Sequence, residues 1–115
     1  MSLTISTKPG MPGDIDIAKV KENINNLSDD RANNYEDWLN VGLAISYELK
    51  EDGRDIWHEF SSRCSSKYNK TECDKTYNGF LKGKSSNPLT IGSIMMWSKE
   101  DNYKNYMTIQ LIEMI

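Results

Sequence analysis

The sequence predicts an all-α fold, a compact single-domain bundle of five to six short helices. Apolar side chains recur at steps of three and four residues in several segments, which is the spacing of one helix face. Trp38, Trp57 and Trp97 fall in three different segments of this kind. Large aromatic side chains shared among short helices are typical of one small core. Alternation of apolar and polar residues is absent over any useful length, so no strand is predicted.

Composition limits the class of protein. A chain of 115 residues with 37% hydrophobic residues and a mean hydropathy of -0.67 fits one domain with a polar surface. No apolar run approaches the ~20 residues that span a bilayer, and residues 1–13 lack the apolar stretch of a signal peptide. The two cysteines, Cys64 and Cys73, favour free thiols in a reducing compartment over a disulfide scaffold. We therefore expect a cytoplasmic protein that does not contact a membrane.

Three parts of the chain differ in composition. Residues 1–13 hold two prolines and two glycines near their end, so we expect a flexible leader. Residues 14–101 carry the helical periodicity and the tryptophans, so they are predicted to form the folded domain. Residues 102–115 are predicted to form a last helix that leads into a following domain, because they are apolar on every face.

The first two helices are separated by a polar break. The first is predicted over about 14–27, with Asp16 or its neighbour Asp14 as the cap. The second covers about 35–49 and is capped by Asn34 or the asparagine before it, Asn33. Gly42 lies inside the second helix, where glycine costs about 1 kcal/mol relative to alanine.

That cost indicates a compensation at Gly42. The expected compensation is the close approach of another backbone or of a tryptophan ring.

Three further helices complete the predicted domain. The third covers about 55–63, and the fourth begins after Thr71 as its cap and ends at Gly83. Thr90 is the expected cap of the fifth helix, which covers about 91–99.

The interior of this fifth helix is predicted from its apolar residues. Ile94, Met95 and Trp97 are expected to point inward.

The predicted core is drawn from the second, third, fourth and fifth helices. Its members are Trp38, Gly42, Trp57, Phe60, Tyr77, Phe80, Ile91 and Trp97.

Positive charge gathers in one segment of an otherwise acidic chain. The net charge is -3, yet residues 61–84 hold six lysines or arginines and two acidic residues. Such a patch attracts phosphate, although most charge runs are ordinary solvated surface. The candidate residues for nucleic-acid binding are Arg63, Lys67, Lys70, Lys82 and Lys84.

No motif in the sequence predicts catalysis. His58 with the two cysteines fits no zinc template, and the cysteines read most simply as core residues. The glycine–lysine run from Gly79 to Ser85 is one residue too short for a phosphate-binding loop and follows a helix instead of a strand. We therefore predict no catalytic residue, no metal site, no cofactor and no enzymatic activity for this chain.

The order of its motifs resembles the primase C-terminal domain, type two. The run Tyr35 to Ala44 (YEDWLNVGLA) resembles the opening of that family. It is followed by Trp57 with Phe60, then a Lys-Tyr pair, then Cys73 with its two aromatics, then TIGSI and a tryptophan. The resemblance covers about residues 27–101, and Tyr77 stands where many members have tryptophan.

The resemblance implies a function. That family is a small helical domain that follows a primase domain and often precedes a helicase in replication proteins of large DNA viruses, phages and plasmids. The chain is then a non-catalytic accessory module that links primase and helicase domains. Its parent is then a primase–helicase with NTPase activity, in the host cytoplasm or the virion.

Two hypotheses follow for the partner. In the first, the basic residues of 61–84 contact single-stranded DNA. In the alternative, the chain is a structural or protein-interaction domain without nucleic-acid binding. Residues 102–115 then pack against a neighbouring domain or a second copy of the chain.

Overall fold

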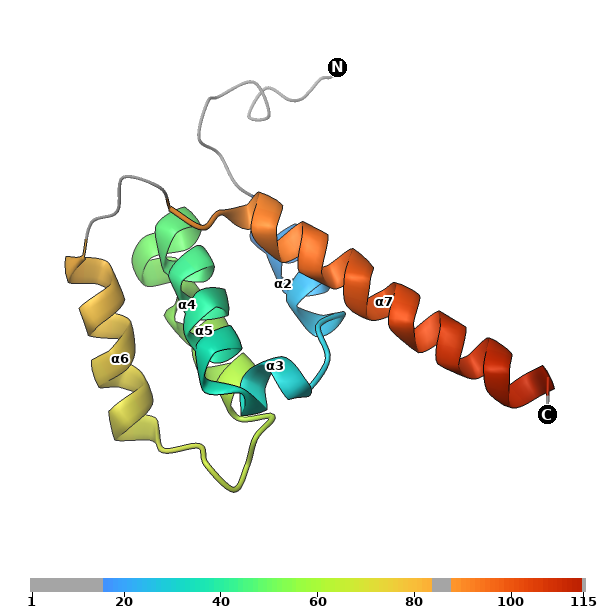
Figure 1. The fold of residues 1–115 in the computed structure, drawn as a ribbon. Helices are drawn as coiled ribbons and strands as arrows, with labels where there is room; N and C mark the ends of the chain where they lie inside the picture. Colours follow the sequence, from blue (N-terminus) through green and yellow to red (C-terminus); the bar gives the residue numbers. More distant parts are fainter. Residues whose placement is uncertain (1–15, 84–87, 115) are drawn as a thin grey trace, which may run out of the picture.

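The computed structural model describes residues 16–83 and 88–114, and within these ranges every regular element is a helix (Figure 1). The all-α class is therefore confirmed, with no strand in the described ranges. The elements are α2 (Ile17–Asn25), α3 (Asp30–Asn33), α4 (Tyr35–Leu49), the 3-10 helix η2 (Lys50–Gly53), α5 (Arg54–Ser61), α6 (Lys70–Lys82) and α7 (Ile91–Met114). The predicted leader, Asp14 and Lys84 lie outside the described residues.

Helix α4 is the central element of the domain. It packs against α3, α5, α6 and α7, and Figure 1 shows α6 along one side of it and α7 on the other. Three apolar residues of α4 are completely inaccessible to solvent, namely Val41, Ala44 and Ile45. Asn34 caps α4 as predicted, because its Oδ1 accepts a hydrogen bond of 3.0 Å from the backbone N–H of Asp37.

Aromatic side chains fill the core between α4, α5 and α6. Trp57 is fully buried, and its ring centroid lies 4.6 Å from that of Trp38 and 5.3 Å from that of Phe80. Its Nε1 donates a 3.0 Å hydrogen bond to the carbonyl of Cys73. The fully buried Tyr77 donates its hydroxyl hydrogen bond to the carbonyl of Lys50. Each buried polar atom of these two rings is thus paired, as burial requires.

The remaining predicted core residues are buried to different degrees. Phe60 is 1% exposed and Gly42 is buried. Four larger residues pack against the core while keeping part of their surface in solvent: Trp38, Phe80, Ile91 and Trp97.

The close approach expected at Gly42 is confirmed. A Cβ placed there would lie 2.5 Å from Cζ3 of Trp57 and would also overlap the ring of Phe80. No side chain fits in that space, so the glycine allows α4 to lie directly against the two rings.

Two helix starts agree with the sequence-based prediction. Asp16 caps α2, because its Oδ1 accepts from the N–H of Ala18 at 3.0 Å. Thr90 precedes α7, and its Oγ1 accepts from the N–H of Gly92 at 3.1 Å.

Two other local predictions are wrong. The polar break at 28–34 contains the short helix α3. Helix α6 begins at Lys70, so its cap is Asn69 and not Thr71. The Oδ1 of Asn69 accepts from the backbone N–H of Glu72 at 3.0 Å. Thr71 is already the second residue inside the helix.

The prediction of two separate helices after Thr90 is also wrong. Helix α7 runs without a break through 24 residues, from Ile91 to Met114. Within it Ile94 is fully buried as expected, but Met95 is 37% exposed and therefore does not point fully inward. Asp101 lies in the middle of α7. Aspartate is unfavourable inside a helix, and here the tertiary contacts of its side chain compensate for the low helix propensity.

Those contacts fix α7 on the body of the domain. The buried carboxylate of Asp101 accepts from the backbone N–H of Ser28 at 2.8 Å and from the guanidinium of Arg31. Before this point α7 packs against α2 and α4, and beyond it the helix projects away from the other elements (Figure 1).

Candidate functional site

Arg63 is engaged inside the fold. Its guanidinium donates to the carbonyls of Leu27 at 2.6 Å and Ile24 at 2.8 Å, and it lies over the ring of Phe60 at 5.5 Å. The side chain is 20% exposed. Because the last carbonyls of a helix lack partners within the helix, Arg63 completes the end of α2. The guanidinium that the sequence predicts to contact DNA is thus hydrogen-bonded to two backbone carbonyls.

Of the other candidate lysines, the structure describes three, which lie just before α6 or at its two ends. Lys67 and Lys70 are exposed at the start of α6, and Lys67 Nζ donates to the carbonyl of Asn33 at 3.0 Å. Lys82 is exposed at the last position of α6, about 18 Å along the axis from Lys70 at 1.5 Å per residue. The structure thus groups Lys67 with Lys70, and separates Lys82 from them.

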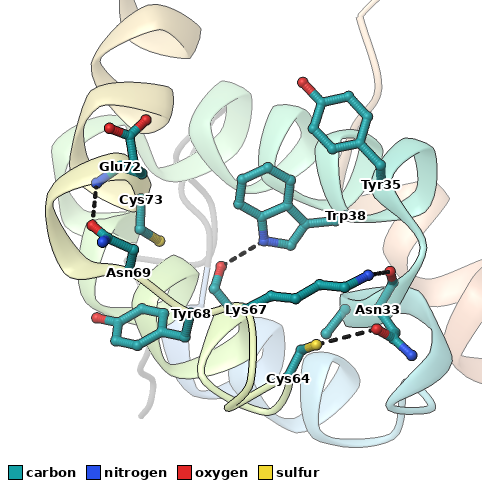
Figure 2. Close-up of a pocket in the computed structure, with 11 residues that line it drawn as sticks. Asn33, Tyr35, Trp38, Cys64, Lys67, Tyr68, Asn69, Glu72 and Cys73 are labelled. Carbon is teal, nitrogen blue, oxygen red and sulfur yellow. Dashed lines mark hydrogen bonds between the residues drawn. The ribbon is translucent and has the colours of Figure 1, made fainter.

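A cleft of about 220 Å³ opens beside Lys67 (Figure 2). Lys70 does not line it but directly follows Asn69, which does. Its walls come from α3, the first turn of α4, the end of α5, the segment 64–69 and the first turn of α6. The lining residues are Ala32, Asn33, Tyr35, Trp38, Ser61, Cys64, Lys67, Tyr68, Asn69, Glu72 and Cys73. A wider hollow between α4 and α6 reaches Gly83 and Pro88, at the border of the described ranges.

Two aromatic rings form one wall of the cleft. The ring of Tyr35 is 70% exposed and lies 5.8 Å from that of Trp38, with the two planes tilted by 37°. Trp38 is held in place because its Nε1 donates to Ser61 Oγ at 2.8 Å and its ring stacks on Trp57. Figure 2 shows Tyr35 and Trp38 together on one side, with the long side chain of Lys67 passing across toward Asn33. This wall is an aromatic surface in which Trp38 is held by the core and the ring of Tyr35 faces solvent.

Tyr68 lies across the cleft, and a chain of hydrogen bonds holds it. Its hydroxyl is 2.7 Å from Nδ1 of His58, whose Nε2 is 2.6 Å from Oδ1 of Asp74. Arg54 completes the chain, with its Nη1 at 3.2 Å from the same Oδ1. The hydrogen bond from His58 holds the pKa of Asp74 below its usual range against the effect of burial, and Arg54 adds to this. The chain ties α5, the segment 64–69 and α6 together.

The two thiols in the cleft are each engaged by the fold. Cys64 Sγ donates to Oδ1 of Asn33 at 3.1 Å. Cys73 is buried, and burial raises the pKa of its thiol, which disfavours the reactive thiolate. Among residues 16–83 and 88–114, no three His, Cys, Asp or Glu side chains gather as they would around a metal ion. The cleft offers aromatic surface, amides and ammonium groups, which is the chemistry of binding.

Sequence reasoning missed this cleft and the hydrogen-bonded chain behind it. Tyr35 was visible only as part of a helix start, and Tyr68 only as part of a basic segment. The partners of Tyr68 lie 10 positions away at His58, and those of His58 lie 16 positions away at Asp74. Only the fold brings them together.

None of the described helices has both the length and the apolarity needed to cross a bilayer.

Comparison with known proteins adds the family. The model of the family described as Primase C terminal 2 (PriCT-2) matches residues 20–98. Over 101 residues the chain is 31% identical to a protein named "Putative helicase 184R" from Invertebrate iridescent virus 6. That alignment covers 83% of this chain and 10% of the relative, so the chain spans about a tenth of the relative's length. No solved structure was found to match this chain. With a family model that covers most of the folded helices, the chain belongs to the Primase C terminal 2 family, and it is a replication-associated helical domain.

Proposed function

We propose that this chain is a non-catalytic accessory module of a DNA-replication primase–helicase, and that it links the primase domain to the helicase domain. The family supports this assignment, as does a viral relative that is about ten times longer and named a helicase. NTP hydrolysis and primer synthesis then belong to the neighbouring domains of a cytoplasmic or virion-borne parent. The chain's own part is to hold those domains in a fixed geometry.

The far half of α7 is the observation that carries this proposal. Beyond Asp101 its large apolar side chains are exposed, from 41% at Met107 to 80% at Met114. The exposed set is Tyr103, Tyr106, Met107, Ile109, Leu111, Ile112 and Met114. Contiguous apolar surface of this kind is rare on a monomer and is typical of an interaction site. The helicase domain is the proposed partner, because in the family resemblance it comes after this domain and α7 leads toward it.

One face of α7 is best suited to that contact. Tyr103, Met107 and Met114 follow one another at steps of four and seven residues, so these exposed apolar side chains share one stripe. Helical geometry at 100° per residue puts this stripe on the side opposite to Ile94, which faces the core. The helix can therefore pack on the body with one face near its start and on a second domain with the other face beyond Asp101.

Amide hydrogen exchange tests the proposal. Residues 103–114 should exchange rapidly in the 115-residue chain and slowly in the purified parent protein, because the contact protects exposed backbone only in the parent. The amides of α4 are the control and should be equally slow in both. Rapid exchange of 103–114 in both proteins would contradict the linking role. If residues 103–114 exchange slowly in the 115-residue chain alone, a second copy of the chain is the partner. Sedimentation at several concentrations then detects that dimer.

Contact with single-stranded DNA is a second candidate function. Lys67 and Lys70 are exposed beside a cleft whose wall is the exposed ring of Tyr35. Positive charge next to an aromatic surface is the usual chemistry of single-strand binding. Of the five predicted residues we propose Lys67 and Lys70 for this contact, since Arg63 is engaged by α2 and Lys82 lies at the far end of α6. Lys84 lies outside the described residues and stays a prediction.

A further inference from the structure

We infer that the cleft beside Tyr35 receives one unstacked base of a single-stranded DNA, with Lys67 and Lys70 contacting the adjoining phosphates. This inference rests on the second candidate function, contact with DNA, and is independent of the linking role of α7. It assigns a base-binding site where charge alone would predict only a diffuse surface.

The size of the cleft sets the size of its occupant. Its volume of about 220 Å³ is below the ~300–1,000 Å³ of sites that enclose drug-sized molecules. It suits a single flat ring system with the rest of the ligand outside. A strand that runs over the surface and inserts one base has this shape, because its sugar and phosphates stay in solvent.

The aromatic wall is already arranged for stacking. Tyr35 offers a ring that is 70% exposed, and the neighbouring Trp38 is fixed by Ser61 and Trp57. The fixed ring of Trp38 lowers the ordering cost of stacking, because one side of the surface is held before the base arrives. Tyr35 is the exposed member of the pair, so it is the residue whose removal should cost most in binding and least in folding.

Polar groups at the rim can meet the edge of the base. Asn33 and Asn69 both line the cleft, and each uses its Oδ1 as an acceptor, from Cys64 at 3.1 Å and from the N–H of Glu72 at 3.0 Å. Their amide NH₂ groups are donors, and every base has acceptors on its edge. The site is therefore tolerant of base identity.

Charge supports the base contact without dominating it. Lys67 uses one of its three ammonium protons on Asn33, which leaves two for a phosphate, and Lys70 is exposed. Glu72 lines the same cleft and the chain as a whole is acidic, so a purely electrostatic attraction would be weak. Two phosphate contacts on a single strand predict a slope of log K against log salt of about -1.4. Five contacts would give about -3.5.

The experiment measures fluorescence anisotropy of a labelled twelve-residue oligothymidine with the full chain, across a salt series. Tyr35→Ala should weaken binding about tenfold at low salt, which is the usual effect of removing one stacking ring. Tyr35→Phe should restore it, because stacking needs the ring and not the hydroxyl. Tyr47→Ala is the matched control, since Tyr47 is 46% exposed near the other end of α4 and away from the cleft.

A second probe separates base from phosphate. An oligonucleotide of the same length that carries abasic spacers keeps every phosphate, so it should bind the unchanged chain about as weakly as oligothymidine binds Tyr35→Ala. Tyr35→Ala should not weaken the abasic probe further. For the lysines, Lys67→Glu with Lys70→Glu should abolish binding at low salt, whereas Lys82→Glu should leave it unchanged.

Several results would overturn the inference. Equal losses for Tyr35→Ala and Tyr47→Ala, or a salt slope near -3.5 to which Lys82 contributes, would mean a diffuse charged surface and no base site. No binding of oligothymidine at low salt would remove both the base site and the DNA candidate. The linking role of α7 would be untouched by either result, because hydrogen exchange in the parent protein tests it separately.

Discussion

The guanidinium of Arg31 and the carboxylate of Asp101 form a two-point ion pair that joins α3 to the middle of α7. Nε of Arg31 lies 2.7 Å from Oδ2, and Nη2 lies 3.0 Å from Oδ1. The Arg31 side chain is 13% exposed and that of Asp101 5% exposed, and Arg31 also lies over the ring of Trp97 at 5.5 Å. Such a pair has fixed geometry, so it determines where α7 crosses the domain.

Asp101→Asn should destabilise the domain by about 3 kcal/mol. The change leaves the charge of Arg31 largely buried with only Glu100, at 3.2 Å, as a partner. Urea unfolding at pH 7 followed by circular dichroism measures the loss. Glu113→Gln is the matched control, because Glu113 is an exposed carboxylate on the same helix, and its effect should be within 0.5 kcal/mol or so. Equal effects of the two changes would mean that the pair does not fix α7.

The same carboxyl makes stability depend on pH in acid. Burial alone raises the pKa of Asp101, but the hydrogen bonds from Arg31 and the Ser28 N–H, with the charges of Arg31 and Lys104, outweigh it and lower that pKa. A carboxyl with a lowered folded-state pKa contributes stability above the unfolded value of about 3.9 and loses it as pH falls further. The free energy of unfolding should therefore be level from pH 7 to 5 and fall below about pH 4.

The Asp101→Asn variant isolates this contribution. The difference in unfolding free energy between the unchanged chain and the variant should narrow as pH falls below about 4, because the unchanged carboxyl becomes neutral there. Urea midpoints at half-unit pH steps measure this difference. A difference that is constant down to pH 2 would contradict the lowered pKa of Asp101.

Gly42→Ala should destabilise the domain by about 1–3 kcal/mol, because the added methyl group meets the rings of Trp57 and Phe80 in the packed core. Gly79→Ala is a matched control inside α6, where a Cβ would have no other atom within 4 Å. It should stabilise the domain by about 0.5–1 kcal/mol through the higher helix propensity of alanine. Thermal unfolding of both variants tests the opposite signs, and a Gly42→Ala protein as stable as the unchanged chain would refute the close packing.

Asn69→Ala should cost about 1 kcal/mol, because it removes the side-chain acceptor for the N–H of Glu72 at the start of α6. Thr71→Ala should be close to neutral, since Thr71 lies inside the helix on an exposed face. Chemical unfolding of the pair of variants distinguishes the two possible caps. A larger loss of unfolding free energy for Thr71→Ala than for Asn69→Ala would support Thr71 as the cap, as the sequence predicts.

The helical class, the caps at Asp16 and Asn34, and the reason for Gly42 follow from local rules and are visible in the sequence. The joining of the last two predicted helices is not, because aspartate and asparagine in tandem resemble a helix break. In the fold, Asp101 is a helix residue because its carboxylate meets Arg31, 70 positions earlier. At this position the tertiary contact outweighs the low helix propensity of aspartate.

Arg63 shows the same limit for the candidate site. A basic residue near other basic residues suggests a phosphate contact, but the partners of Arg63 are backbone carbonyls 36 and 39 positions earlier in the chain. The cleft is lined by Tyr35 and Tyr68, which come from different segments, and no periodicity in the sequence indicates that they approach each other.

An unbroken α7 has a mechanical consequence. A helix of 24 residues is about 36 Å long, and about 20 Å of it extends beyond Asp101. The ion pair holds α7 near its midpoint. A change of 10° in the angle between α7 and the rest of the domain would move the far tip of the helix by about 3–4 Å. A small change in the angle between α7 and the body is therefore larger at the exposed end of the helix than at the ion pair.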